Sequence, residues 1–258
     1  MTLTERLRRA GAADQDRSDQ IAECAPALEL RMPALELRMV VKEYPGSPPV
    51  RALDKVSVRI DAGEMVSVVG PSGSGKSTML HMMGTLDRPS SGRVLVDGID
   101  TTDLDDKALS ALRGRKIGFV FQRFFLLPGT TAIDNVANGL LYAGTPPLLR
   151  RIAALEALNR VGLGHRIEHL PSEMSGGELQ RVAVARALIH RPAFVLADEP
   201  TGNLDSRSSG AIMDLLRSLH AEGSTIVVIT HDPDIAASTP RQVQVLDGRI
   251  QAGSGAGR

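Results

Sequence analysis

Residues 70–77 read Gly70-Pro-Ser-Gly-Ser-Gly-Lys76-Ser77, and this stretch decides the fold. It matches the pattern G-x-x-x-x-G-K-[ST], with a short apolar run before it (64–70) and a helical pattern after it (76–85). Its glycines allow a tight turn whose N–H groups point at a polyphosphate, and the helix that follows adds the positive end of its dipole. Lys76 supplies a cation for the outer phosphates, and the Ser77 hydroxyl can ligate Mg²⁺. A flexible Gly/Ser linker is the alternative, and the strand and helix on either side argue against it.

Strand and helix patterns alternate on both sides of this loop. The expected strands cover 40–44, 56–60, 64–70, 93–99, 117–121, 194–197, 225–229 and 243–246. The expected helices cover 76–85, 176–190 and 206–220, and the stretch 124–173 carries helical patterns only. Together they predict an α/β fold with a mostly parallel sheet and an all-helical insertion.

The two ends of the chain lack such patterns. Residues 1 to about 33 are rich in Ala, Asp, Arg and Gln without a sustained apolar period, so we expect a tail without packed elements. Residues 26–32 are repeated as residues 33–39, both reading PALELRM, which we interpret as a small duplication. The second copy runs on into the strand expected at 40–44. The glycine-rich end, 252–258, is predicted to be a second tail.

The composition narrows the class of protein. The 258 residues are 42% apolar and 23% charged, which is typical of a soluble globular domain. Lys and Arg number 30 and Asp and Glu number 30, whereas proteins that wrap nucleic acid by charge show a basic surplus. The single cysteine, Cys24, excludes an intramolecular disulfide, and no run approaches the roughly 18 apolar residues of a membrane span. Because the start lacks a secretory signal, we expect a cytosolic chain.

Polar side chains follow several of the expected buried strands. Asp198 and Glu199 come directly after one strand, Gln122 after a second, and His231 one residue after a third. The carboxyl ends of parallel strands meet at one edge of a sheet, so these side chains should converge near the phosphate loop. Asp198 can hold Mg²⁺ through water, and Glu199 can face an attacking water as general base or orienter. A solvated turn is the alternative for the two acids.

A second candidate anion site opens the helix expected at 176–190. Ser175 is placed to cap this helix, and Gly176 and Gly177 leave bare N–H groups at its positive end. The alternative is a plain cap before an Arg-rich amphipathic helix. One nucleotide cannot obviously fill both this site and the phosphate loop.

The combination of motifs resembles the nucleotide-binding subunit of ABC transporters. It consists of Tyr44, GPSGSGKS (70–77), Gln122, MSGGE (174–178), VLADE (195–199), Asn203-Leu-Asp205 and His231. The stretches LDRPSSGRV, GFVFQRFFLLP, ADEPTGNLDS and THDP are most similar to the LolD/MacB group, lipoprotein-release and macrolide- or peptide-export ATPases that serve FtsX-like membrane subunits. The resemblance covers residues 34–251 and implies a P-loop NTPase fold with a RecA-like core, an antiparallel β subdomain and a helical subdomain at about 123–184.

The resemblance also implies roles for individual residues. Tyr44 would stack on adenine, Glu199 would be the catalytic carboxylate, and His231 would be the γ-phosphate switch. Gln122 would sense the γ-phosphate and Mg²⁺ and report to the membrane subunit, with Ser77 and Asp198 completing the metal site. The ATP phosphates and Mg²⁺ would be bound by Gly70, Pro71, Ser72, Gly73, Ser74, Gly75, Lys76, Ser77 and Thr78.

The resemblance resolves the question of two anion sites. Two copies of the chain would lie head to tail with two ATP molecules between them, and Asp205 would lie at the seam. The second copy would contact the γ-phosphate through Ser175, Gly176, Gly177 and Glu178. In the family, Leu and Gln are more common than Met174 and Glu178, and we expect the charge of Glu178 to weaken closure of the dimer.

The expected partner is an FtsX-like membrane permease, with the chain peripheral on the inner face of the cell membrane. The apolar residues 124–127 would border the groove for that partner, or alternatively form core of the helical insertion. An FtsX-like cell-division complex is an alternative to export. The single cassette and the neutral net charge argue against an ABC-type ATPase that acts on nucleic acid. The lack of an Asn-Lys-x-Asp motif argues against a GTPase. The second anion site argues against a small-molecule kinase.

Overall fold

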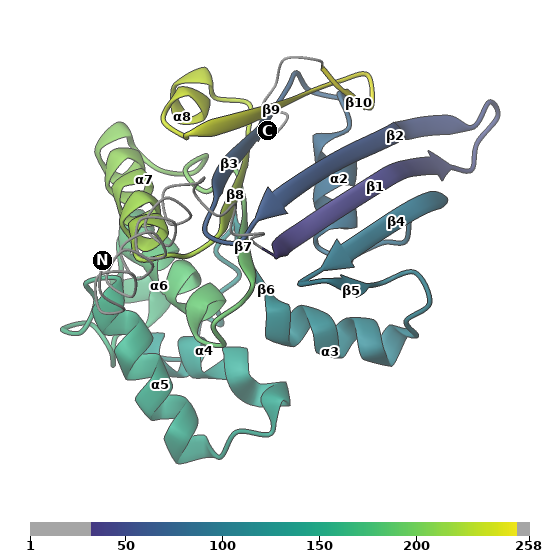
Figure 1. Cartoon of the computed structure of the whole chain (residues 1–258). Coiled ribbons are helices and arrows are strands. Elements are labelled where there is room, and N and C mark those ends of the chain that lie inside the picture. The colour runs from purple at the N-terminus through teal and green to yellow at the C-terminus, as the bar shows by residue number, and fades with distance from the viewer. Residues whose placement is uncertain (1–31, 252–258) are drawn as a thin grey trace, which may run out of the picture. The chain divides into compact units, whose positions relative to one another are not determined.

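The computed structural model describes residues 32–251. The first 31 residues of the predicted N-terminal tail, the first heptapeptide copy apart from Met32, and the predicted tail at 252–258 lie outside the described residues. Within residues 32–251 two sheets pack on either side of one helix, α2, and a group of helices covers the far face of the larger sheet (Figure 1).

The larger sheet confirms the predicted parallel core. It has six strands in the order β10-β9-β3-β8-β7-β6, and every pairing except β9–β10 is parallel. Its strands are β3 (Met65–Val69), β6 (Ile117–Phe121), β7 (Phe194–Asp198), β8 (Ile226–Thr230), β9 (Arg241–Leu246) and β10 (Arg249–Ile250). Because β3, β6, β7 and β8 run parallel, their carboxyl ends lie at one edge, as the sequence predicts.

The smaller sheet is antiparallel, with the strand order β2-β1-β4-β5. Its strands are β1 (Pro33–Tyr44), β2 (Val50–Asp61), β4 (Ser91–Val96) and β5 (Ile99–Asp100). The second heptapeptide copy lies wholly inside β1, where Leu35 and Leu37 are buried. The strand expected at 56–60 is the second half of a longer strand, because the first half of β2 carries exposed and charged residues that hide the alternation.

The helices follow the sequence pattern except at α3 and at the five-residue α8, which the sequence reading did not predict. They are α2 (Lys76–Met83), α3 (Asp106–Lys116), α4 (Ala132–Ala137), α5 (Pro147–Arg160), α6 (Gly176–Leu188), α7 (Ser206–Ala221) and α8 (Pro233–Ala237), with short 3₁₀ turns η1 (Asn138–Ala143) and η2 (Pro171–Glu173). The sequence reading missed α3, because only Leu109 and Leu112 of this helix are buried. Its start is fixed by Asp105, whose side chain accepts a hydrogen bond from the Ala108 N–H.

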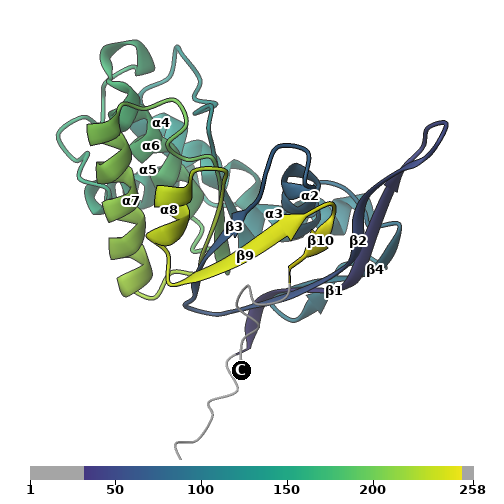
Figure 2. The same cartoon turned by 90° about the horizontal axis from the view of Figure 1, so that it is seen from above.

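Two cores lie on opposite faces of the parallel sheet (Figure 2). Alternate residues of β8 serve one core each: Val227 and Ile229 pack with α2 and the antiparallel sheet, whereas Ile226 and Val228 pack with α4 to α7. Burial on both faces explains the continuous apolar runs that predict these strands.

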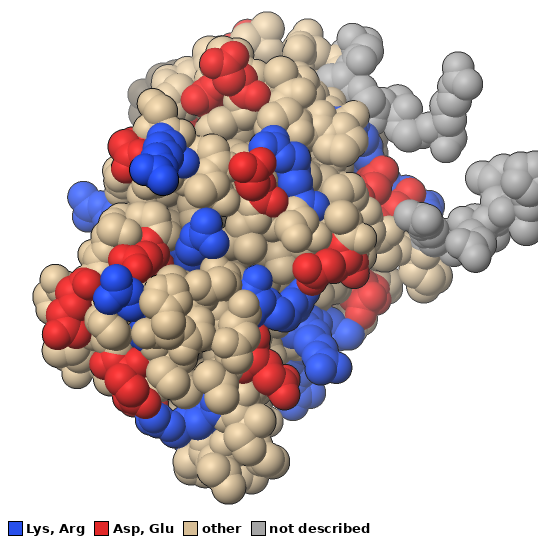
Figure 3. All heavy atoms as spheres, turned by 90° about the vertical axis from the view of Figure 1, so that its left-hand side faces the viewer, with Lys and Arg blue, Asp and Glu red and all other residues tan. Residues whose placement is uncertain are grey.

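The surface carries both signs of charge. Figure 3 shows Lys and Arg interspersed with Asp and Glu over the face at the left of Figure 1. Among residues 32–251, no helix is long and apolar enough to span a bilayer.

Candidate functional site

The phosphate loop, residues 70–77, joins β3 to α2. Gly73 and Gly75 have φ angles of 79° and 105°, a left-handed conformation that glycine adopts without strain. A Cβ atom at Gly70 would collide with the carbonyl oxygen of Val245 in β9. The Lys76 ammonium donates to the carbonyl oxygens of Gly70 at 2.6 Å and Pro71 at 2.8 Å. A cation is thus held at the loop, in a position to meet a phosphate.

The C-terminal hairpin supports this loop, a feature that the sequence reading missed. The Gly248 N–H donates to the Ser74 carbonyl at 2.8 Å, and the Gly248 carbonyl accepts from the Asp54 N–H at 2.8 Å. Asp247 and Gly248 both have positive φ, 49° and 72°. An Asp-Gly pair between two strands is typical of a type I′ hairpin and could have been recognised from sequence.

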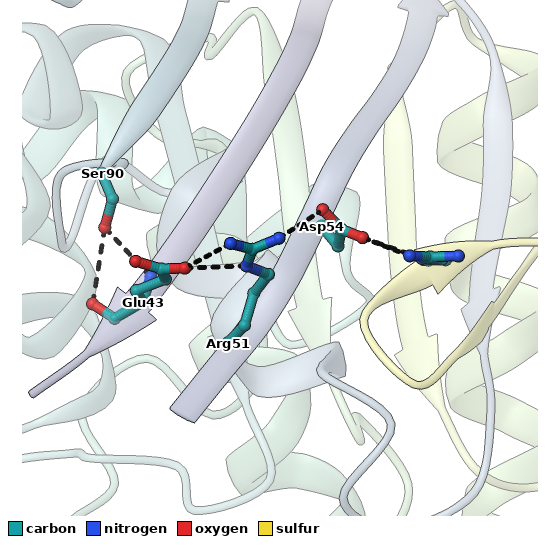
Figure 4. A network of polar contacts seen from close by, with 5 residues as sticks. Glu43, Arg51, Asp54 and Ser90 are labelled. Carbon is teal, nitrogen blue, oxygen red and sulfur yellow. Dashed lines mark hydrogen bonds and ion pairs between the residues drawn. The ribbon is translucent and has the colours of Figure 1, made fainter. Parts of the chain in front are cut away.

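Side chains tie the hairpin to the antiparallel sheet as well (Figure 4). Arg249 of β10 donates to the Asp54 carboxylate at 2.6 and 2.9 Å, and Arg51 links Asp54 to Glu43. Glu43 is joined to Ser90 by two backbone–side-chain hydrogen bonds. The network therefore connects strands β1, β2 and β10 with Ser90, which directly precedes β4.

Tyr44 ends β1, opposite Val50 of β2. Its hydroxyl donates to Asp87 at 3.4 Å, and the Lys42 ammonium lies 5.0 Å from the centre of its ring. A Cβ atom at Gly75 would lie 2.6 Å from the carbonyl oxygen of Ala52 in β2, so the phosphate loop packs against the same strand pair that carries Tyr44.

Two acids lie where β7 ends. The pKa of Asp198 is raised above its ordinary value of 3.8 by burial and by the charge of Glu199, and the charges of His81 and Lys76 only partly offset this. Glu199 adopts a left-handed backbone conformation, with φ 44°. This conformation is held by a hydrogen bond from the Glu199 N–H to the Ile229 carbonyl at 2.9 Å.

Glu199 and His231 form a close pair, as the strand-end pattern predicts. His231 Nδ1 lies 2.6 Å from Glu199 Oε1, and the His231 backbone N–H donates to the same oxygen at 3.0 Å. The Thr230 hydroxyl donates to Oε2 at 3.1 Å. Both carboxylate oxygens are therefore engaged, and the role of Thr230 is a contact that the sequence reading did not foresee.

Gln122, at the end of β6, is held by Asn203. Its side-chain NH₂ donates to Asn203 Oδ1 at 3.2 Å, and Asn203 donates back to the Gln122 carbonyl at 2.9 Å. Gln180 is fully buried and donates to the carbonyls of Phe121 and Pro200, joining α6 to the ends of β6 and β7. The motif Asn203-Leu-Asp205 does not by itself predict this contact of Asn203, and the sequence shows Gln180 only as a polar residue within the expected helix at 176–190.

The signature segment, residues 174–178, opens α6. Ser175 caps the helix: its Oγ accepts from the Glu178 N–H at 3.3 Å, and its own N–H donates to Glu178 Oε2 at 2.9 Å. Gly176 and Gly177 lie against Leu204 and Ser208 at the start of α7. Asp205 caps α7 by accepting from the Ser208 N–H and hydroxyl, and these bonds lower its pKa.

The predicted site residues thus fall into two groups within the described chain. The phosphate loop shares the carboxyl edge of the sheet with Asp198, Glu199, His231 and Gln122. The signature segment and Asp205 form the second group, and no hydrogen bond or ion pair among residues 32–251 joins them to the phosphate loop.

The apolar residues 124–127 were expected either to border the groove for the membrane partner or to form core of the helical insertion, and the structure shows some of each. Leu126 packs against the helical core, whereas the residues Phe125 and Leu127 are 62% and 53% exposed. Arg186 of α6 holds the loop by donating to the carbonyls of Phe124 at 2.8 Å and Phe125 at 2.6 Å. The exposed pair follows Gln122 closely in sequence, and Asn135 of α4 holds the backbone of Leu127 by accepting from its N–H at 2.8 Å and donating to its carbonyl at 3.2 Å.

The family model for ABC transporters matches residues 53–202. The chain belongs to this family. An uncharacterized ABC transporter ATP-binding protein of Thermotoga maritima is 49% identical over 218 residues, which are 84% of this chain and 93% of that protein. The macrolide export ATP-binding/permease protein MacB of Hyphomonas neptunium is 48% identical over 224 residues, 86% of this chain but 35% of MacB. The chain therefore spans about a third of that relative.

Solved structures agree with this assignment. The dimeric post-hydrolysis structure of the ATP-binding cassette MJ0796, bound to ADP and Pi, has a TM-score of 0.75 at 44% identity and covers 84% of this chain and 96% of that one. The expected P-loop NTPase fold of the ABC type is confirmed, as is the resemblance to the MacB-like group. The chain is an ATP-binding protein with ATPase activity.

Proposed function

We propose that this chain is the ATP-hydrolysing subunit of an exporter similar to MacB, and that two copies close head to tail on two ATP molecules. The observation that carries the proposal is that one chain has two segments suited to bind phosphate, with no hydrogen bond or ion pair between them among residues 32–251. One nucleotide at the phosphate loop leaves the signature segment without a ligand, whereas a second copy can present that segment to the same γ-phosphate. The relatives named MacB and the dimeric cassette MJ0796 support this arrangement.

The nucleotide would lie across the two sheets. Tyr44 would stack on adenine, and the loop N–H groups with Thr78 would bind the phosphates. Lys76 would exchange its two carbonyl acceptors for phosphate oxygens. That exchange replaces neutral acceptors with charged ones, which form stronger hydrogen bonds with an ammonium group.

The donor set fits Mg²⁺. Asp198 lies beside a second acid and has a raised pKa, so a cation near it would relieve an unfavourable concentration of negative charge. Ser77 is exposed at the start of α2 and offers a hydroxyl oxygen, with Gln122 as a further oxygen donor. Among residues 32–251 no cluster of three or more His, Cys, Asp and Glu side chains could hold a metal alone, so the phosphates would supply the other ligands. Bound Mg²⁺ would neutralise charge on the γ-phosphate.

Glu199 would orient and deprotonate the attacking water. In the described state both of its oxygens are occupied by His231 and Thr230. A turn of the His231 ring from Glu199 toward the γ-phosphate would free an acceptor position on Oε1, so that more of the carboxylate could serve the attacking water. Asp205 and the signature segment of the second copy would then close the site around the nucleotide.

The proposed partner is an FtsX-like permease, which would place the chain on the cytosolic face of the membrane. Phe125 and Leu127 offer apolar surface a few residues after Gln122, in a loop that Arg186 and Asn135 hold by hydrogen bonds to its backbone. The mixed charge of the face in Figure 3 lacks the basic character that a nucleic-acid partner favours. Co-purification with an FtsX-like permease from the same genome, lost in a Phe125→Asp, Leu127→Asp variant that still hydrolyses ATP, would test this partner.

The main test is the variant Glu199→Gln. We expect kcat to fall by about 10²- to 10⁴-fold while ATP still binds, because the amide keeps the shape but cannot accept a proton. ATP should then accumulate between two copies, seen as a stable dimer by size-exclusion chromatography with light scattering. Glu222→Gln, which breaks an exposed ion pair with Arg160, is the control and should hydrolyse ATP normally. A Glu199→Gln protein that binds ATP and stays monomeric would contradict the proposal.

A further inference from the structure

The carboxylate of Glu178 is bonded to the group that is proposed to hold the second copy's γ-phosphate. The Ser175 hydroxyl donates to Glu178 Oε2 at 2.9 Å, and the Ser175 N–H donates to the same oxygen at 2.9 Å. A serine hydroxyl has one hydrogen, so Ser175 can donate it to the carboxylate or to a phosphate, but not to both.

The negative charge of Glu178 is held in place. The Ser175 N–H lowers the pKa of Glu178; burial opposes this, and the Ser175 hydroxyl and the Arg166 charge add to it. Arg166 Nε lies 3.2 Å from Glu178 Oε1, and its NH1 lies 2.9 Å from His169 Nε2. The side chain of Glu178 is 24% exposed, so its charge is only partly screened by water. The carboxylate is therefore ionised throughout the neutral pH range.

The first turn of α6 also favours an anion at the same place. The N–H groups at the start of a helix and the helix dipole attract negative charge, and Glu178 already supplies it. An arriving γ-phosphate brings further negative charge to this point. Glu178 and the phosphate therefore compete for one hydroxyl hydrogen and for one positive helix end.

We propose that Glu178 is a positioning residue that acts as a latch on Ser175 and sets the ATP concentration at which two copies close. The inference rests on the proposed head-to-tail dimer. In the open chain the latch keeps the Ser175 hydroxyl turned toward Glu178. Closure exchanges this bond for one to the γ-phosphate, and Arg166 offsets the charge that Glu178 leaves behind. A glutamine at this position would keep the cap through its side-chain oxygen but remove the charge.

A purely structural cap makes a different prediction. If Glu178 only closes the helix, its replacement by Gln changes thermal stability and leaves ATP-driven pairing alone. The two readouts are the melting temperature of the free chain and the dissociation constant of the ATP-bound dimer, measured by sedimentation. Glu199→Gln serves as the background, because hydrolysis is then too slow to disturb the equilibrium.

In that background we expect Glu178→Gln to tighten the dimer by about three- to five-fold, the effect of one charge at a helix terminus. This gain in affinity should shrink in 0.5 M salt, because the electrostatic screening length is then only on the order of 4 Å. The matched control is Glu173→Gln, because Glu173 caps η2 by accepting from the Leu170 N–H at 2.7 Å and loses the same charge nearby. The dissociation constant of its ATP-bound dimer should match that of the Glu199→Gln chain within about two-fold.

Arg166→Gln tests the same latch by removing the positive charge that lies beside the Glu178 carboxylate. It should weaken the dimer when Glu178 is present and have no effect once Glu178 is Gln, because the two effects are coupled. The inference is overturned if Glu178→Gln pairs no more tightly than Glu173→Gln, or if Arg166→Gln weakens both backgrounds equally. If the Glu199→Gln chain itself stays monomeric with ATP, the proposed function fails and the latch fails with it. If that chain pairs and the latch variants do not differ, only the latch is wrong.

Discussion

The phosphate loop and the signature segment are both placed to bind phosphate, but different bonds hold them. The loop lies at the carboxyl edge of the parallel sheet and is supported by β9, β2 and the Gly248 turn, which are distant in sequence. The signature segment is organised by bonds within four residues, from Ser175 to Glu178, with Arg166 beside them. The first is built by tertiary packing, and the second by local capping.

This difference predicts how each region responds to change. Alterations at the loop should disturb nucleotide binding in a single chain, since the loop conformation depends on its neighbours. Alterations at the signature segment should leave single-chain binding intact and affect only pairing.

The largest effect is expected from Gly70→Val. The new side chain would meet the Val245 carbonyl and lie 2.7 Å or less from Ser74 Oγ, so the loop must shift. ATP affinity should fall by about 100-fold or more and the melting temperature should fall as well, measured by calorimetry. Gly210→Ala in α7 is the control, because the added methyl group would meet nothing within 4 Å beyond the local helix backbone, and it should bind ATP normally. Unchanged ATP affinity in Gly70→Val would show that the loop does not depend on β9.

An intermediate effect is expected from Ser175→Ala. Loss of the cap removes about 1 kcal/mol of stability, and loss of the hydroxyl removes a γ-phosphate donor. ATP should bind the single chain with unchanged affinity, while the dimer in the Glu199→Gln background weakens by about ten-fold. Thr131→Ala removes the matching cap of α4 and should lower stability without weakening the dimer. If the ATP-bound dimers of the two variants had equal dissociation constants, Ser175 would not contact the γ-phosphate of the second copy.

The smallest effect is expected from Asp198→Asn without nucleotide. The folded-state pKa of Asp198 is raised, so ionisation of this group destabilises the fold. The stability it contributes is present below its unfolded-state pKa near 3.8 and is lost as pH rises through the folded-state pKa. The Asn variant should therefore melt about 2 °C higher at pH 7, with a difference that vanishes near pH 3. A variant that melts lower at pH 7 would show that the charge of Asp198 is compensated in the free chain.

The sequence predicts the parallel core because its strands are buried on both faces and read as continuous apolar runs. It does not reveal α3, where two buried leucines give too weak a period, or the full length of β2, whose polar half pairs only within the antiparallel sheet. Convergence of Glu199 and His231 follows from parallel strand ends. The contacts of Asn203 with Gln122 do not, because these residues are 81 positions apart and no rule of local pattern joins them.

The family resemblance predicts residue roles that the spacing of motifs in the sequence does not. The roles of Tyr44, Asp205 and the second copy come from resemblance alone and stay predictions. The departure at Glu178 was visible in the sequence as an extra charge. Only the structure shows that the Glu178 carboxylate accepts a hydrogen bond from the Ser175 hydroxyl. This contact is the basis of the proposed latch.

The hairpin of β9 and β10 means that the nucleotide-binding unit is longer than its motifs. A shortened chain ending at residue 240 would retain every motif from Tyr44 to His231, yet its Ser74 carbonyl would lose the Gly248 N–H and Gly70 would lose its β9 neighbour. Asp54 would also lose its Arg249 partner. The final strands therefore act as a buttress, and trimming them would impair nucleotide binding without removing a single residue that touches the nucleotide.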